Sequence, residues 1–169
     1  MLWITTAAII AAMYVALTFV SMAFGLDKNA IQIRFSETLA VVAFFTPAAI
    51  PGLTIGCFLA NILTGCALLD IFLGPVATLI GAVGAYLIGK APKRSVSRFL
   101  CTIPNILANT VIVTFVCIVC YTAPSMRSIA LVPFYAVTVF LGELISCGIL
   151  GTLLLLALEK NRGRMFKNV

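Results

Sequence analysis

Six apolar segments, separated by short polar or proline-containing stretches, make up most of the chain. A helix needs about 20 predominantly apolar residues to cross the hydrocarbon core of a bilayer. The first segment has no basic residues before it and exceeds the apolar core of a signal peptide, so we expect a retained span. The expected spans are Leu2–Phe24, Ser36–Thr46 with its flanks, Pro51–Cys66, Asp70–Gly89, Phe99–Tyr121 and Ile129–Leu158.

The apolar run from Phe35 to Cys66 is divided by the stretch TPAAIPG, residues 46–52. Two prolines and a glycine so close together end a helix, because proline lacks the backbone N–H and crowds the preceding turn. The two spans that result are shorter than about 20 residues. Each span either crosses the membrane or enters it only in part, and the sequence leaves both interpretations open.

The composition of the chain is that of a membrane protein. Of its 169 residues, 63% are hydrophobic and 9% are charged, whereas a soluble domain has about 25% charged residues. We therefore predict an all-α fold, a compact bundle of six transmembrane helices that forms a single domain over residues 1–169. The net charge of +6 does not indicate nucleic acid, because the cations lie at the ends of the spans.

The positions of the cations predict how the chain is oriented. Most of the eleven Lys and Arg residues fall in the linker before the fifth span or in the C-terminal tail. Two spans separate these clusters, so both lie on one side, and positive residues mark the cytoplasmic side. Six spans then place both termini in the cytoplasm. The clustered cations are Lys90, Lys93, Arg94, Arg98, Lys160, Arg162, Arg164 and Lys167.

Several kinds of catalytic and metal site are excluded by what the sequence lacks. It has no histidine, which excludes zinc-protease and Ser-His-Asp sites, and no G-x-x-x-x-G-K-S/T pattern for ATP. Cys117 and Cys120 form one C-x-x-C pair, but no second pair completes a metal site. The cysteines are expected to pack as small apolar residues, and no catalytic residue, metal or cofactor is predicted.

Glu143, Asn105 and Asn109 are candidates for a binding site within the spans. An ionisable side chain near the middle of a membrane helix costs about 2.5–3.5 kcal/mol. Glu143 is therefore expected either to contact a ligand or ion, or to pair with Arg34 or Arg127. Asn105 and Asn109 are four residues apart and share one helix face, where their amides suit the edge of a base. Structural hydrogen bonding between helices is the alternative.

Arg34, Glu37 and Asp70 lie where the second and fourth spans begin. Arg34 and Glu37 are three residues apart, so they can pair on one helix face, and the helix dipole also favours Glu37 near an N-terminus. They either form a simple surface pair or close the first outer loop over a cavity. In the second case we expect them to pair with each other when the cavity is empty. Asp70 either caps its helix or contacts a ligand.

Small residues recur along the first span in two interleaved ladders. Spacing of four residues between small side chains gives a helix a smooth face that another backbone can approach closely. The ladders predict a docking face for another membrane protein, with packing inside the chain as the alternative. Their members are Ala7, Ala8, Ala11, Ala12 and Ala16.

Longer stretches of the sequence are similar to a known transporter family. The run IQIRFSETLAVVAFFTPAAIPGLTIGCFLANIL and the later LLDIFLGPVATLIGAVGAYL, IPNILANT and GELISCGILG resemble the QueT family. Members of that family are substrate-binding S components of energy-coupling factor (ECF) transporters. The pieces RFSE and LGPVATL are the most specific, and the alanine ladders resemble the face by which S components dock.

This resemblance implies a six-helix S component in a bacterial cell membrane, with a cavity that opens outward. It implies one transmembrane coupling subunit and two ATPase subunits as partners, which would hydrolyse ATP in place of this chain. The implied substrate is a 7-deazaguanine, either queuine or 7-aminomethyl-7-deazaguanine.

Roles for the candidate residues follow from the chemistry of such a base. Glu143 is expected to accept N–H groups of the guanine edge, and Asn105 or Asn109 to serve its carbonyl or remaining donors. Glu37 or Asp70 is expected to bind the amine on the 7-substituent. The aromatic candidates for stacking on the ring are Phe35, Phe72, Phe115 and Phe134.

Other functions are also compatible with the sequence. One is a small-solute carrier that acts alone and is coupled to ions, with Glu143 as its proton site. Another is an S component for a different vitamin-like solute, such as riboflavin or biotin. A third is an intramembrane enzyme or an assembly protein.

Overall fold

The structure is a computed structural model that describes residues 2–26, 32–91, 94–124 and 127–160. Within these ranges it contains helices and no strand, as the sequence predicts. Four of the cations used to predict the orientation, Lys93, Arg162, Arg164 and Lys167, lie outside the described residues. The elements are α1 (Leu2–Ala23), η1 (Phe35–Phe44), α2 (Ala49–Leu63), α3 (Leu68–Gly89), α4 (Arg94–Leu100), α5 (Ile103–Cys120), α6 (Leu131–Glu143), η3 (Leu144–Leu150) and α7 (Gly151–Lys160).

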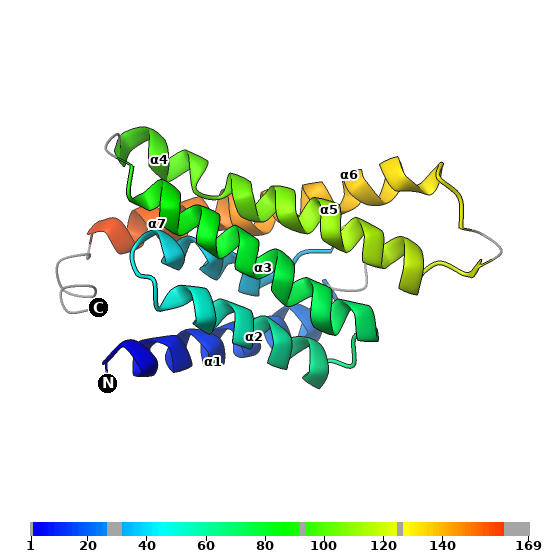
Figure 1. The fold of residues 1–169 in the computed structure, drawn as a ribbon, viewed down its shortest axis with the longest axis horizontal. Coiled ribbons are helices and arrows are strands. Elements are labelled where there is room, and N and C mark those ends of the chain that lie inside the picture. The colour runs from blue at the N-terminus through cyan, green and yellow to red at the C-terminus, as the bar shows by residue number, and fades with distance from the viewer. Residues whose placement is uncertain (1, 27–31, 92–93, 125–126, 161–169) are drawn as a thin grey trace.

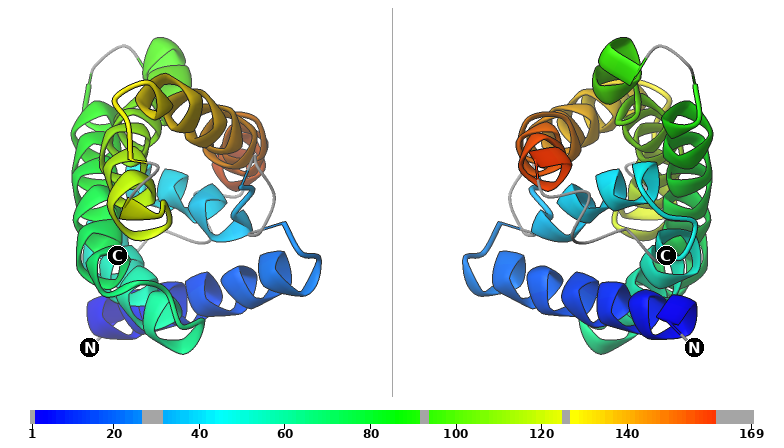
Figure 2. Two further views of the ribbon diagram at one scale, coloured as in Figure 1. Left: turned by 90° about the vertical axis from the view of Figure 1, so that its right-hand side faces the viewer. Right: turned by 90° about the vertical axis from the view of Figure 1, so that its left-hand side faces the viewer.

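The longer helices surround η1. Viewed end-on, α1, α2, α3 and α5 and the continuous rod of α6, η3 and α7 form a ring with η1 inside it (Figure 2). Helix α1 begins and α7 ends at the same end of the bundle, where α4 also lies (Figure 1). The structure thus agrees with a chain whose two ends emerge on one side, and the cytoplasmic identity of that side remains a prediction.

Four of the helices are long and apolar enough to cross a membrane: Leu2–Ala23, Leu68–Gly89, Val96–Cys120 and Leu131–Lys160. They correspond to the expected first, fourth, fifth and sixth spans. The fifth is divided, because α4 ends at Leu100 and α5 begins at Ile103. Pro104 lies in the first turn of α5, where a residue without an N–H is tolerated and a new helix begins.

The expected second and third spans are the two shorter helices, η1 and α2. The chain turns between Phe44 and Ala49, so Pro47 marks the break, whereas Pro51 lies in the first turn of α2. Helix η1 is a 3-10 helix of 10 residues, about 20 Å long at 2.0 Å per residue. Helix α2 has 15 residues and is about 22 Å long. Both are shorter than the hydrocarbon core, which is about 30 Å thick.

Helix η1 supplies the centre of the apolar core. Eight of its residues are buried, and most of them are small or β-branched. Val41 and Ala43 have no exposed surface. A Cβ added to Gly151 would lie 3.0 Å from Cγ1 of Val41, so the start of α7 approaches η1 closely. Small side chains on both sides allow a central helix to be enclosed in this way.

The two alanine ladders of α1 face different surroundings. A Cβ on Gly52 would lie 2.7 Å from the carbonyl oxygen of Ala7, and a Cβ on Gly56 would lie 3.0 Å from that of Ala11. Ala7 and Ala11 therefore pack against α2 within the chain. The predicted docking face is therefore smaller than the sequence suggested. Only the second ladder is exposed, and its members are Ala8, Ala12 and Ala16.

Candidate functional site

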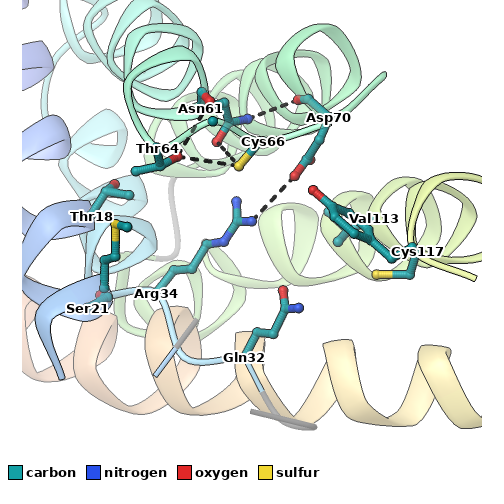
Figure 3. Close-up of a pocket in the computed structure, with 13 residues that line it drawn as sticks. Thr18, Ser21, Gln32, Arg34, Asn61, Thr64, Cys66, Asp70, Val113 and Cys117 are labelled. Carbon is teal, nitrogen blue, oxygen red and sulfur yellow. Dashed lines mark hydrogen bonds and ion pairs between the residues drawn. The ribbon is translucent and has the colours of Figure 1, made fainter. Parts of the chain in front are cut away.

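A cavity of about 390 Å³ opens among the last turns of α1, α2 and α5 and the first turn of α3. These helix ends lie at the end of the bundle opposite α4 (Figure 1). Its volume lies within the range of about 300–1,000 Å³ that is usual for small-molecule sites. The residues that line it are Thr18, Ser21, Met22, Gln32, Arg34, Asn61, Thr64, Gly65, Cys66, Asp70, Val113, Cys117 and Tyr121 (Figure 3).

Arg34 and Asp70 form an ion pair in this cavity. The Arg34 Nη2 and Asp70 Oδ2 atoms are 3.6 Å apart, and the Asp70 side chain is 2% exposed. Asn61 Nδ2 donates a hydrogen bond of 2.9 Å to the Asp70 carbonyl oxygen, which fixes the start of α3 against the end of α2 (Figure 3). The oxygen Asp70 Oδ1 has no hydrogen-bond donor among the described residues. Asp70 is thus an anionic group with unused acceptor capacity.

The predicted pairing of Arg34 with Glu37 is wrong in this structure. Arg34 precedes η1 and extends into the cavity towards Asp70, on α3. Glu37 lies in the first turn of η1 and points into the bundle, where it is 2% exposed. Arg34 therefore does not pair with Glu37, which is near it in sequence. It pairs with Asp70, which lies 36 positions further along the chain.

Glu37 belongs to a buried polar network that joins four elements. Its Oε1 accepts a hydrogen bond from the Tyr14 hydroxyl of α1. Its Oε2 accepts from Nδ2 of Asn105 at 3.0 Å and from Nδ2 of Asn109 at 3.5 Å. Asn105 Nδ2 also lies 3.4 Å from Oε2 of Glu143 on α6. Two carboxylates thus share one amide, and the prediction that Asn105 and Asn109 lie on one helix face is confirmed.

This network lies deeper in the bundle than the cavity. Asn105 precedes Val113 by eight residues on α5, which corresponds to about 12 Å along the helix. A small cavity of about 20 Å³ lies between the two, lined by Gln32, Arg34, Asn109, Val113, Val139 and Glu143. This small cavity forms a neck between the main cavity and the network. Two of the residues predicted for the site, Asn109 and Glu143, line the neck. Glu37 and Asn105 lie behind it.

The loop before η1 is held in place from two sides. The backbone N–H of Arg34 donates to Ser146 Oγ at 3.2 Å, and that of Phe35 donates to Ser21 Oγ at 2.7 Å. Ser146 lies in η3, a π-helical segment, and such segments occur frequently at functional sites. A Cβ on Gly142 would overlap the Gln32 carbonyl oxygen, so the loop backbone passes directly over α6.

The structure adds residues to the site that the sequence did not single out. Gln32, Thr64 and Cys66 line the cavity, but each is an ordinary polar residue near a helix end, and only the fold brings them together. Tyr121 lies in the cavity wall at the end of a span, a position where aromatic residues are common in membrane proteins. Of the aromatic residues expected to stack on a ligand, Phe72, Phe115 and Phe134 are each more than half exposed. None of the three lines the main cavity, and Phe134 lines a smaller cavity beside it.

Comparison with known proteins identifies the family. The model of the QueT transporter family matches residues 4–160. The chain belongs to the QueT transporter family. A queuosine precursor transporter QueT from Lactococcus lactis subsp. cremoris (strain MG1363) is 39% identical over 77 residues, which are 46% of this chain and 45% of that protein. No solved structure matches the chain.

Membership of the QueT family confirms the resemblance described from the sequence. Together with the four long apolar helices, it establishes a multi-pass membrane protein with a role in transport. The matched region spans less than half of the Lactococcus relative, so the substrate and partners of this QueT family member are treated below as proposals.

Proposed function

We propose that the chain is the substrate-binding S component of an ECF transporter and captures a 7-deazaguanine queuosine precursor outside a bacterial cell. The observation that carries the proposal is the cavity with a charged pair at one end of the bundle of a QueT family member. In the orientation predicted from the cations, with both termini in the cytoplasm, this end faces outward. The cavity is large enough for a bicyclic base, and polar side chains make up most of its lining, which suits a base with several hydrogen-bonding groups.

In the proposed complex, Asp70 binds the ammonium group of the 7-substituent. The ammonium replaces the Arg34 guanidinium at Asp70, and Asp70 Oδ1 offers a second acceptor. The base lies in the main cavity with its guanine edge towards the small cavity beside Val113. There Glu143 and the amide oxygen of Asn109 can accept N–H groups of that edge. Glu37 and Asn105 hold these two side chains in position from behind.

The exposed ladder on α1 is the proposed docking face for a transmembrane coupling subunit, which would bring two ATPase subunits. Replacing Ala12 with leucine should reduce uptake in cells with the coupling module by about tenfold or more, because the larger side chain prevents close approach of a helix. Ligand binding to the purified variant should not change. Met13→Leu, at a neighbouring exposed position, is the matched control. Normal uptake by Ala12→Leu would exclude this face as the docking site.

A ligand titration of the purified chain in mild detergent tests the function directly. Heat of binding is measured for queuine, 7-aminomethyl-7-deazaguanine, guanine and riboflavin. We expect saturable binding of queuine or 7-aminomethyl-7-deazaguanine, at least about tenfold tighter than that of guanine, because guanine lacks the basic alkyl amine that Asp70 would bind. Tight binding of riboflavin alone, or no binding of any compound to folded protein, would contradict the proposal.

An ion-coupled carrier remains the second candidate, because Glu37 and Glu143 share the amide of Asn105 in the interior. Paired buried carboxylates are typical of proton relays in transporters. The chain reconstituted alone in vesicles separates the two functions. An S component should bind ligand without accumulating it, whereas a carrier should accumulate it and lose that activity when a protonophore is added.

A further inference from the structure

A second chamber adjoins the main cavity and has no part in the binding scheme above. It measures about 110 Å³. A cavity of about 10–15 Å³ on this measure holds one water molecule, so the chamber has room for a group of several atoms. Three residues line both spaces and form the boundary between them: Gln32, Cys117 and Tyr121. The rest of the lining comes from α6: Phe134, Tyr135, Thr138 and Val139.

The chamber combines aromatic surfaces with hydroxyl groups. Tyr121, Phe134 and Tyr135 supply rings, and the last two are packed edge to face with centroids 5.6 Å apart. The Tyr135 hydroxyl lies 3.0 Å from Thr122 Oγ1, and the Thr138 hydroxyl donates to the Tyr135 carbonyl oxygen at 3.0 Å. A hydroxyl can also accept. There is no charged side chain in the lining. These surfaces suit a small, uncharged, hydroxylated ring better than a second ion.

Tyr121 relates this chamber to Asp70. Its hydroxyl accepts a hydrogen bond of 3.2 Å from the backbone N–H of Ala67, which precedes the first turn of α3. Asp70 lies in that turn. Partial burial raises the pKa of Tyr121, and this outweighs the opposite effect of the hydrogen bond from Ala67. The boundary of the chamber is therefore close to the carboxylate proposed to hold the ligand amine, and the phenol keeps its proton.

We propose that this chamber is a subsite for a hydroxylated five-membered ring attached to the ligand amine. The inference rests on the proposed function. An ammonium held at Asp70 can direct its substituent past Tyr121 into the chamber, with the ring on the aromatic surfaces and its hydroxyls towards Thr138 and Tyr135. The site then favours queuine, whose amine carries such a ring, over 7-aminomethyl-7-deazaguanine, whose amine carries none.

Filling the chamber tests the inference. In titrations of the purified full-length chain, the wild type should bind queuine at least about fivefold tighter than 7-aminomethyl-7-deazaguanine. Thr138→Phe places a ring in the chamber and should weaken queuine binding about tenfold or more, while the affinity for the smaller ligand changes less than about threefold. Val137→Phe, at the adjacent position exposed on the outside of α6, is the matched control and should change neither affinity.

The smaller ligand shows in the same experiment whether Thr138→Phe is folded, and Thr138→Leu repeats the test with a smaller side chain. Equal weakening of both ligands by both variants would overturn the inference, as would unchanged queuine binding or a wild type that prefers the smaller ligand. In each of these cases a deazaguanine still binds to the wild type, so the proposed function survives. Failure of the folded wild type to bind either compound would overturn both.

Discussion

Asp70→Asn should weaken the binding of an amine-bearing 7-deazaguanine by at least about 100-fold, or about 2.7 kcal/mol. Asparagine keeps the shape of the side chain but removes the charge that the ammonium needs. It also leaves Arg34 in the cavity without its partner, and breaking a buried ion pair by removing one partner costs about 3–5 kcal/mol. The unpaired guanidinium then repels the ligand amine. Titration calorimetry of the purified variant measures the effect.

Two comparisons make this result specific. A 7-deazaguanine without an amine should lose much less affinity, because it never used the charge of Asp70. Glu159→Gln breaks the other ion pair of the described chain, with Arg98 at 3.0 Å. That pair is partly exposed and lies at the opposite end of the bundle, so its loss should leave binding unchanged. Equal losses for ligands with and without an amine would show that Asp70 supports the fold rather than the ligand.

Glu37→Gln should lower the thermal stability of the protein more than any other conservative change in the network. The Glu37 carboxylate accepts from Tyr14, Asn105 and Asn109, and all three partners are donors. A glutamine brings its own NH₂ group among them, so at least one buried donor loses its acceptor, at about 1–3 kcal/mol. For a chain of this size, 1 kcal/mol corresponds to about 2–4 °C in Tm. Thermal unfolding in detergent, followed by tryptophan fluorescence, gives the value.

Tyr14→Phe is the matched comparison for this prediction. It removes the donor to Oε1 of Glu37 and keeps the aromatic ring, so one buried acceptor loses its partner. The hydrogen bonds of Asn105 and Asn109 to Oε2 remain, so the loss should be smaller than that of Glu37→Gln. Equal Tm values for wild type and Glu37→Gln would mean that the network contributes nothing to folding. The buried carboxylate would then have to be kept for transport alone.

Much of the fold follows from the sequence because hydropathy and proline act locally. The first and fourth spans need only a long apolar run, and the break near Pro47 needs only the missing N–H of that residue. The shared face of Asn105 and Asn109 follows from the helical period. The 3-10 form of η1 does not follow in this way, because it depends on how tightly the surrounding helices enclose small residues such as Val41 and Ala43.

The site was only partly predictable from the sequence, because its contacts also depend on how the helices pack. Its candidate charges stand out in an apolar chain, but their partners depend on how α3 lies beside the loop before η1. Sequence spacing favours Arg34 with Glu37, whereas the fold brings Arg34 to Asp70. In the same way, the ladders on α1 look equivalent until Gly52 and Gly56 of α2 select Ala7 and Ala11 as packing partners.

The shortness of α2 has a consequence for the surrounding lipid. Helix η1 is enclosed by protein, but α2 exposes Ile55, Leu59, Ile62 and Leu63 on the outside of the bundle. Its length of about 22 Å is well below that of α3, whose 22 residues span about 33 Å. We expect lipid beside α2 to be compressed relative to lipid beside the longer helices, at a cost of a fraction of a kcal/mol per Å of hydrophobic mismatch. The chain should sit in a bilayer that is thinner on one flank than on the other, and acyl chain length should influence its tilt.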